Sequence, residues 1–460
     1  MSGTPYVILI NPPFGFSSNP ELTVSYPLGL MYIASLLEKK GVKVKIIDFI
    51  NNRDTRFIEN TIKNNKADIF GISVLTSNRY EAFKIVKIIR KLHKQSKVVL
   101  GGTHATLLYQ QILENTDIDA IFLGESELSF LEYSMAFGQN GDVSHIPGIA
   151  FKKASGEIIA NPIKWVEDID TIPLPAFHLV DLDNYKNKRN EIDFHMLTSR
   201  GCPFFCNFCS LPAIHNGRYR LHSVARVLEE LELVSGFKKN CRVMLHDDFL
   251  SAADKRMREL CEGIIKKGIK LKWSIRSRVD TVDLDTLKLM RSSGCEEIFY
   301  GIESGSRAIL QSMNKRFNIE DAKNAFSLTK KSGIKAICYI IVGYPGENHG
   351  TVKDTQKLLF SLAPDKIYFS LAGIFPGTTL YQQSIKDGVI KDSYWLKNGN
   401  RVPLYTKDMS CINMLMYVYI IRLSLERGLI RKIIFLLRSI PRELSFEYNV
   451  LKSLLLDKTN

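Results

Sequence analysis

A chain of 460 residues is too long for one ordinary hydrophobic core, so its length favours two domains with an appendage. Apolar residues make up 45% and charged residues 24% of the chain, a composition that excludes an intrinsically disordered protein. The net charge of +14 does not come from a basic block, because the lysines are spread along helix faces, and this pattern predicts solvated lysines rather than a nucleic-acid partner.

Residues 1–137 form the first predicted unit, a doubly wound parallel α/β sheet of the Rossmann-like kind. Its β-rich runs alternate with helical runs such as LGLMYIASLLEKKG and YEAFKIVKIIRKLHKQ, which is the pattern of a βα repeat. The first run follows MSGTP, which lacks the basic region and cleavage site of a signal peptide, so no export is predicted. The β-rich runs are YVILI, VKVKIIDF, ADIFGISV, KVVLGG and DAIFLGE.

Residues 138–190 are predicted to be a linker that wraps between two domains. A small hairpin-like patch, GIAFKKASGEIIA, is followed by DIDTIPLPAFHLVDL. Proline and acidic residues interrupt any helical or strand period in this second stretch.

Residues 191–385 contain a second series of alternating strands and helices. Six β-rich runs, each followed by a helical run, predict a partial (β/α)6 barrel of the TIM type. In that architecture the chemistry lies at the C-terminal ends of the strands, and here those ends carry a cysteine cluster, HDD, GIES and GYPGE. The β-rich runs are DFHMLTSRG, RVMLHDDF, LKWSIRSRV, EEIFYGIESG, KAICYIIVG and DKIYFSLAG.

Residues 386–460 are predicted to be helical and basic, without further strands. Positions 401–460 hold ten Lys or Arg against five Asp or Glu, and one face of positions 413–456 is apolar. Three interpretations remain open. These helices either pack on the barrel, or they cap the substrate site or lie on an anionic membrane surface, which would favour a lipid-like substrate. No apolar stretch reaches the roughly 18 residues of a membrane span.

Three cysteines, Cys202, Cys206 and Cys209, lie close together in the loop TSRGCPFFCNFCSLP after the first barrel strand. Thiolates are the ligands of iron–sulfur clusters, and three of them leave one iron of a [4Fe–4S] cluster free. A structural zinc site would need a fourth ligand, and His215 does not fall at the usual zinc-finger spacing. The remaining cysteines are predicted to be core residues, so the pattern suits a reducing, cytoplasmic setting: Cys241, Cys261, Cys295, Cys338 and Cys411.

The segment CPFFCNFC resembles the CxxxCxxC motif of the radical S-adenosylmethionine (SAM) superfamily, including an aromatic residue, Phe208, before the last cysteine. The resemblance implies that the free iron binds the amino and carboxylate groups of SAM. An electron from the cluster then cleaves SAM to a 5′-deoxyadenosyl radical. An external donor such as flavodoxin or ferredoxin supplies that electron.

The same resemblance implies SAM-binding residues at later strand ends. Asp247 and Asp248 of HDDF lie where the family binds the methionyl amino group, although a helix N-cap is an alternative role. Two nearby arginines, Arg276 and Arg278, either bind the SAM carboxylate or pair with these aspartates. GIESGS resembles the ribose-binding segment and YIIVGYPGE the adenine-binding segment, while FPGTTLY resembles the close of the sixth strand. The residues assigned by these two segments are Glu303 and Ser304 for the ribose, and Gly343 for the adenine.

The first unit resembles the cobalamin-binding domain that precedes many radical SAM domains, through NPPFG, YPLGLMYIASLLEKKG, DIFGISVLTSN, KVVLGGTHAT and FLGESE. The cobalt-binding DxHxxG motif of other cobalamin proteins is absent, and His145 in DVSHIPG has the wrong spacing. The resemblance therefore implies base-off cobalamin without a protein histidine ligand. The residues it assigns to cobalamin are Ser73, Thr76, Ser77 and Asn78 facing the corrin, Gly101, Gly102, Thr103 and His104 at its tail or edge, and Gly124 and Glu125; His104 is alternatively an ordinary turn residue.

Together the two resemblances imply a class B radical SAM methyltransferase. Such an enzyme abstracts hydrogen from a small-molecule or lipid-like substrate and transfers a methyl group from methylcobalamin to the resulting unactivated carbon. Three other functions compete with this one: a cobalamin-dependent cyclase or rearrangement enzyme, a non-catalytic cobalamin sensor, and a tRNA methylthiotransferase. The last needs cysteines for a second cluster in its first domain, and no cysteine precedes Cys202. No catalytic side chain is assigned.

Overall fold

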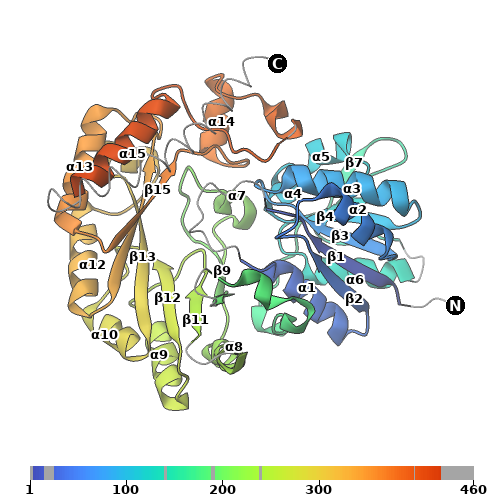
Figure 1. Ribbon diagram of the computed structural model, residues 1–460, viewed down its shortest axis with the longest axis horizontal. Helices are drawn as coiled ribbons and strands as arrows, with labels where there is room; N and C mark the ends of the chain where they lie inside the picture. The colour runs from blue at the N-terminus through green and yellow to red at the C-terminus, as the bar shows by residue number, and fades with distance from the viewer. Residues whose placement is uncertain are drawn as a thin grey trace.

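The computed structural model describes residues 4–14, 25–138, 142–187, 192–237, 241–397 and 399–425. Figure 1 shows two lobes, with the N-terminal sheet on one side and the second sheet on the other. The green segment that contains β9 and α7 lies between them. The α/β architecture predicted from the sequence is confirmed in both lobes.

The N-terminal sheet has the order β2-β1-β3-β4-β5-β6-β7, and its first five strands run parallel. Successive side chains of β1 enter opposite cores. Val7 and Leu9 pack with α1 and α6, whereas Ile8 and Ile10 pack with α2, α3 and α5. A strand buried on both faces must be continuously apolar, which explains the run YVILI. The elements are β1 Tyr6–Asn11, α1 Leu28–Lys39, β2 Lys43–Asp48, α2 Thr55–Lys63, β3 Ile69–Ser73, α3 Arg79–Leu92, β4 Lys97–Gly101, α4 Thr103–Leu107, α5 Tyr109–Asn115, β5 Ala120–Phe122 and α6 Glu127–Gly138.

The first part of the predicted linker belongs to this sheet. Strands β6 (Ile149–Lys152) and β7 (Ile158–Ala160) form a hairpin that extends the sheet antiparallel to β5. The hairpin covers the edge of β5, whose backbone groups would otherwise lack partners. Only the following stretch, with the short 3-10 helices η1 Ile169–Thr171, η2 Phe177–Leu179 and η3 Leu182–Tyr185, runs between the lobes.

The second sheet has six parallel strands in the order β15-β14-β13-β12-β11-β8, the partial barrel that the sequence predicts. Asp254, Asp283 and Asn348 accept backbone hydrogen bonds at the N-termini of α9, α10 and α13, so each helix begins at a side-chain cap. The elements are β8 Asp193–Met196, α8 Val224–Phe237, β11 Arg242–Leu245, α9 Lys255–Lys267, β12 Lys272–Ser277, α10 Leu284–Ser292, β13 Cys295–Glu303, α11 Arg307–Ser312, α12 Ile319–Lys331, β14 Lys335–Val342, α13 His349–Leu362 and β15 Lys366–Leu371.

The cysteine loop is framed by a small antiparallel ladder that the sequence did not predict. Strands β9 (Ser199–Gly201) and β10 (Tyr219–Leu221) pair with each other, and α7 (Leu211–His215) lies between them in the chain. Both ends of the loop are thereby anchored to regular structure.

Helix α14 (Thr379–Lys386) ends at the predicted start of the C-terminal region, which contains η4 (Asp392–Leu396) and, as its last described element, α15 (Cys411–Leu425). Helix α15 lies beside α13 (Figure 1) and buries Met414, Val418 and Ile421 in the barrel core. Residues 411–425 therefore pack on the barrel, while the predicted membrane-facing or capping role of the later positions falls on residues 426–460, outside the described residues. In the part of the chain that is described, no helix has the length and apolarity of a membrane span.

Candidate cofactor site between the two sheets

The C-terminal strand ends of both sheets open into one cavity of about 810 Å³. Its N-terminal half lies outside β1 and β3, the point where the strand order of a doubly wound sheet reverses and where such folds bind ligands. Its other half lies at the barrel mouth. The residues that line this second half include Ser199, Arg200, Gly201, Ile214, His215, His246, Asp248 and Arg276.

The three clustered cysteines lie half-buried in the loop between β9 and α7. Burial raises the pKa of all three thiols, that of Cys209 to about 12, so they need nearby positive charge to become thiolates. In the described residues no three His, Cys, Asp or Glu side chains converge closely enough to hold a single metal ion. Three thiolates are the ligands that a [4Fe–4S] cluster with one open iron requires.

Polar contacts hold the cysteine loop against the barrel. The Asn207 side chain donates to the carbonyl oxygen of Ser312 at 2.7 Å, and the Asn314 side chain donates to that of Phe205 at 2.6 Å. The guanidinium of Arg278 lies 3.8 Å from the ring centre of Phe204. The loop is thus held in place by α11 and by the segment after β12.

The two aspartates of HDDF face opposite ways because successive residues of an extended segment alternate in direction. Asp248 lines the cavity and accepts a hydrogen bond of 3.3 Å from the backbone N–H of Gly201. Asp247 is fully buried away from the cavity and accepts hydrogen bonds from Thr198 and Ser199. We therefore remove Asp247 from the proposed SAM-binding set and retain Asp248.

Replacing Asp247 with asparagine is expected to stabilise the apoprotein at neutral and higher pH. The Asn side chain can accept the same two bonds at one oxygen and donate to the Thr198 hydroxyl from its amide. Burial raises the pKa of Asp247 from 3.8 to about 6, so wild-type stability falls by up to about 3 kcal/mol as the pH rises through that range. The difference in melting temperature between variant and wild type should be larger at about pH 8 than at about pH 4.5. A difference that does not change with pH would contradict this account.

The two candidate arginines also have different surroundings. Arg276 lines the cavity. Arg278 instead pairs with Asp280 at 2.7 Å, donates to the carbonyl oxygen of Arg316 and is buried. Neither arginine forms an ion pair with Asp247 or Asp248 within the described ranges. Arg276 thus remains a candidate for the SAM carboxylate, whereas Arg278 supports the cysteine loop.

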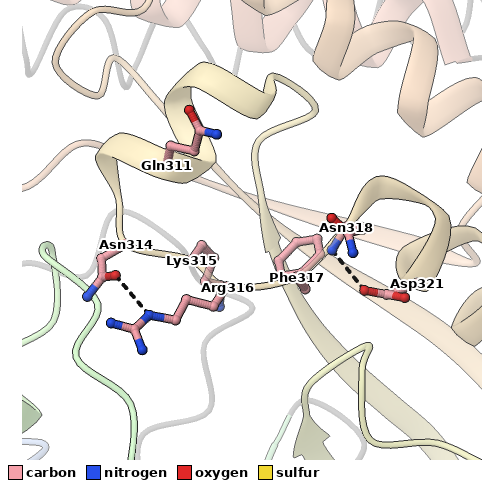
Figure 2. Close-up of a pocket in the computed structure, with 7 residues that line it drawn as sticks. All are labelled: Gln311, Asn314, Lys315, Arg316, Phe317, Asn318 and Asp321. Carbon is pink, nitrogen blue, oxygen red and sulfur yellow. Dashed lines mark hydrogen bonds between the residues drawn. The ribbon is translucent and has the colours of Figure 1, made fainter.

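Glu303 ends β13 in the left-handed region, at φ +64°, where the register shifts between β13 and β14. Its carboxylate pairs with Lys315 at 3.1 Å, and both side chains are about nine-tenths buried. The sequence analysis missed Lys315, which also lies 5.9 Å from the ring centre of Phe208. Figure 2 shows Lys315 in the segment after α11, where it lines a smaller pocket of about 420 Å³ together with Asn314 and Arg316. This lysine holds the Glu303 carboxylate near the cysteine loop.

Two other residues predicted to bind SAM, Ser304 and Gly343, pack against neighbouring protein groups and do not line the cavity. Ser304 is fully buried and its hydroxyl lies 3.3 Å from that of Thr355, so it does not face the cavity. Gly343 has φ +89°, and an added Cβ would lie 2.4 Å from the sulfur of Met414 in α15. Only glycine fits where α15 crosses the end of β14, which was not evident from the sequence.

The predicted cobalamin residues divide into two groups. The cavity is not lined by Thr76, Ser77, Asn78 or His104, but it is lined by Ser73, Gly101, Gly102, Thr103, Gly124 and Glu125. His104 is buried, with Nδ1 3.2 Å from the Thr76 hydroxyl and its ring against that of Trp395 in η4. Burial lowers the pKa of His104 to about 3, so the ring is neutral. These residues join the first sheet to the C-terminal region.

Glu125 is held by two arginines of the β9–β10 ladder. Arg220 donates to it at 2.8 Å, and Arg200 lies 3.5 Å away and also pairs with Glu127 at 2.7 Å. Burial alone would raise the pKa of Glu125, but the hydrogen bond and charges of these arginines hold it below its usual value. Sequence reasoning missed both arginines, although Arg200 stands two residues before Cys202.

Comparisons with known proteins agree with this geometry. Residues 196–359 match the family model of the radical SAM superfamily, and residues 22–134 match that of the B12 binding domain. An uncharacterized methyltransferase of Pyrococcus horikoshii is 33% identical over 383 residues, which cover 82% of each chain. An anaerobic magnesium-protoporphyrin IX monomethyl ester cyclase of Rubrivivax gelatinosus is 29% identical over 391 residues, covering 82% of this chain and 69% of that one.

Two solved structures share the fold. The cobalamin-dependent SAM radical enzyme OxsB, with aqua-cobalamin and SAM bound, aligns with a TM-score of 0.76 at 19% identity over 96% of this chain and 72% of that one. The radical SAM methyltransferase TsrM from Kitasatospora setae, with cobalamin and a [4Fe–4S] cluster bound, aligns with a TM-score of 0.70 at 19% identity. This alignment covers 83% of this chain and 78% of that one. At this identity the likeness concerns the fold. The family matches show that the chain belongs to the radical SAM superfamily, as a cobalamin-dependent enzyme whose cofactors are a [4Fe–4S] cluster, SAM and cobalamin.

Proposed function

We propose that this enzyme transfers a methyl group from cobalamin to an unactivated carbon of a small molecule. The observation that carries the proposal is the single cavity, which runs from the strand ends of the B12-binding sheet to the barrel mouth beside the cysteine loop. Two cofactors in one chamber can act on the same substrate atom. The relative named as a methyltransferase, at 33% identity, supports this reaction class.

The chain's own residues bind and orient, because the bound cofactors supply the radical and the methyl group. Cys202, Cys206 and Cys209 would hold the cluster. The polar ends of SAM would meet Asp248 and Arg276, which line the cavity at the barrel mouth. Glu303, which is paired with Lys315 and lies outside the lining of this cavity, would meet the ribose. At the other end the bulk of cobalamin would lie against residues without large side chains, namely Ser73, Gly101, Gly102, Thr103 and Gly124.

Base-off cobalamin without a histidine ligand is part of the proposal. His104 is the histidine of the predicted cobalamin set, and its ring is directed to Thr76 and Trp395 rather than into the cavity. Ligation of cobalt by His104 would require this packing to open.

Two histidines inside the barrel, His195 and His246, favour a substrate with a polar group. His195 is buried, neither of its ring nitrogens has a hydrogen-bond partner within the described residues, and its ring centre lies 5.2 Å from that of His246. Burial lowers the pKa of His195 to about 4 and that of His246 to about 3, so both rings are neutral. Neutral imidazoles beside Arg276 suit an oxygen-bearing group better than an alkyl chain. A lipid-like substrate would have to carry such a group.

An external one-electron donor such as flavodoxin or ferredoxin, in a reducing cytoplasm, completes the proposal. A cluster held by half-buried thiolates with one open iron is oxygen-sensitive, and SAM cleavage consumes one electron for each radical formed.

The second candidate is a cobalamin-dependent cyclase, which the 29% identity to an enzyme named as a cyclase favours. One experiment separates the candidates. Anaerobically reconstituted enzyme is incubated with reductant, SAM carrying a ¹³C-labelled methyl group, and a small-molecule extract of cells that lack the gene. The methyltransferase proposal predicts 5′-deoxyadenosine and a labelled methyl on carbon in one product. Formation of 5′-deoxyadenosine with an unlabelled product supports the cyclase, and its complete absence supports a cobalamin sensor.

A further inference from the structure

The strand that leads into the cysteine loop is tied to both lobes by buried polar groups. On the barrel side, Asp247 accepts hydrogen bonds from Thr198 and Ser199, and Arg256 donates to the carbonyl oxygen of Thr198 at 2.8 Å. Strand β9 follows at once and ends one residue before Cys202. Its position in the middle of Figure 1 shows that it occupies the junction of the two lobes.

On the cobalamin side, the same strand is held by two carboxylates of the N-terminal sheet. Arg200 of β9 pairs with Glu127 at 2.7 Å and approaches Glu125 at 3.5 Å. Arg220, which stands opposite Arg200 in the β9–β10 ladder, also donates to Glu125. Glu125 lies in the loop between β5 and α6 and Glu127 begins α6, and with Arg200 they line the cavity where cobalamin is proposed to bind.

These ion pairs are shielded from water. The four side chains are only 7 to 9% exposed. Arg200 lies 5.3 Å from the ring centre of Tyr32 in α1, and Arg220 donates to the carbonyl oxygen of Val166 at 2.6 Å. Charges removed from water interact strongly and tolerate little change of geometry, because an unpaired buried charge is costly. An exposed pair nearby, Arg218 just before β10 with Glu167 just before η1, lacks this property.

We propose that Arg200, Arg220, Glu125 and Glu127 are positioning residues that set the distance and orientation between cobalamin and the [4Fe–4S] cluster. The four side chains connect the loop after β5 to the residue two positions before the first cluster ligand. Movement of one cofactor relative to the other would require a buried charge to lose its partner. Such control matters for the reaction, since a misplacement of about 1 Å between reacting groups costs on the order of 10²-fold in rate. The proposal depends on the two cofactors and not on the identity of the substrate.

The test measures the cobalt-to-cluster distance in the loaded enzyme. Holoenzyme containing cob(II)alamin and the reduced cluster is studied by pulsed dipolar EPR, with iron and cobalamin contents determined for every sample. Wild type should give a single narrow distance distribution. Arg200→Gln should give a broadened distance distribution while retaining both cofactors. Arg200→Lys should give a distribution of intermediate width, because one ammonium group cannot bridge both glutamates as the guanidinium does. The control Arg218→Gln should match wild type.

A second variant keeps the test decisive if Arg200→Gln fails to load its cluster. Glu127→Gln leaves the whole cysteine loop unchanged and preserves the contact between Arg220 and Glu125, yet it removes the carboxylate nearest to Arg200. A broadened distribution in Glu127→Gln supports the proposal. A fully loaded Arg200→Gln or Glu127→Gln enzyme with the narrow wild-type distribution overturns it, and this outcome would leave the proposed methyl transfer untouched, since that is judged by label transfer.

Discussion

Replacing Cys206 with alanine is expected to abolish reductive cleavage of SAM. Cys206 is the central ligand of the three, and its thiol lies close enough to those of Cys202 and Cys209 for their charges to interact. Two remaining thiolates cannot retain a [4Fe–4S] cluster with one iron left free for SAM. The measurement is 5′-deoxyadenosine formed under strong reductant, together with iron content and the cluster EPR signal, and all three should fall to the level of unreconstituted protein.

The matched control is Cys241→Ala. Cys241 is a buried core cysteine just before β11, at the N-terminal end of a barrel strand and thus at the end remote from the cavity. The Cys241→Ala variant should keep full iron content and SAM cleavage, and it should lose some stability because the substitution leaves a small cavity. Full iron content in Cys206→Ala would show that another group ligates the cluster, and the assignment of the site would then be wrong.

Replacing Gly102 with alanine is expected to destabilise the N-terminal sheet by about 2–4 kcal/mol and to remove cobalamin binding with it. Gly102 has φ +98° and ψ 172°, a conformation nearly restricted to glycine. An added Cβ would lie 2.8 Å from the carbonyl oxygen of Val74 and 3.1 Å from its nitrogen. Val74 cannot yield, because it donates to Gly101 and accepts from His104 through its backbone. The loop after β4 would therefore move, and it lines the cavity.

The adjacent glycine is the control. At Gly101 an added Cβ would meet nothing closer than 3.9 Å, and the backbone lies in the ordinary strand region of β4. Gly101→Ala should change the unfolding free energy of the apoprotein by less than about 1 kcal/mol. Denaturant unfolding of the two apoproteins measures the difference in stability, and cobalamin retention after gel filtration is compared between Gly102→Ala and wild type. Equal stability of the two variants would refute the role of backbone crowding at Gly102.

Short-range patterns in the sequence predicted the α/β elements of both lobes correctly. Runs such as YVILI are buried on both faces of a parallel sheet, so their composition alone predicts a central strand. Likewise the six β-rich runs of the barrel became six parallel strands in chain order. The cysteines belong to one eight-residue loop, so chain connectivity alone keeps their thiols near one another.

What the sequence by itself determined is therefore local: two α/β units, their order in the chain, and the cofactors that their motifs indicate. The tertiary structure decided which side chains at those ends face the cavity. Asp247 and Asp248 are neighbours of identical chemistry, yet only packing against Thr198 and Ser199 assigns Asp247 to the interior. His104 faces Trp395, almost 300 positions later in the chain. The ion pairs of Arg200 likewise join segments more than 70 residues apart, so no local pattern can encode them. A residue type and its spacing set which chemistry is available, whereas burial and long-range partners set where that chemistry is directed.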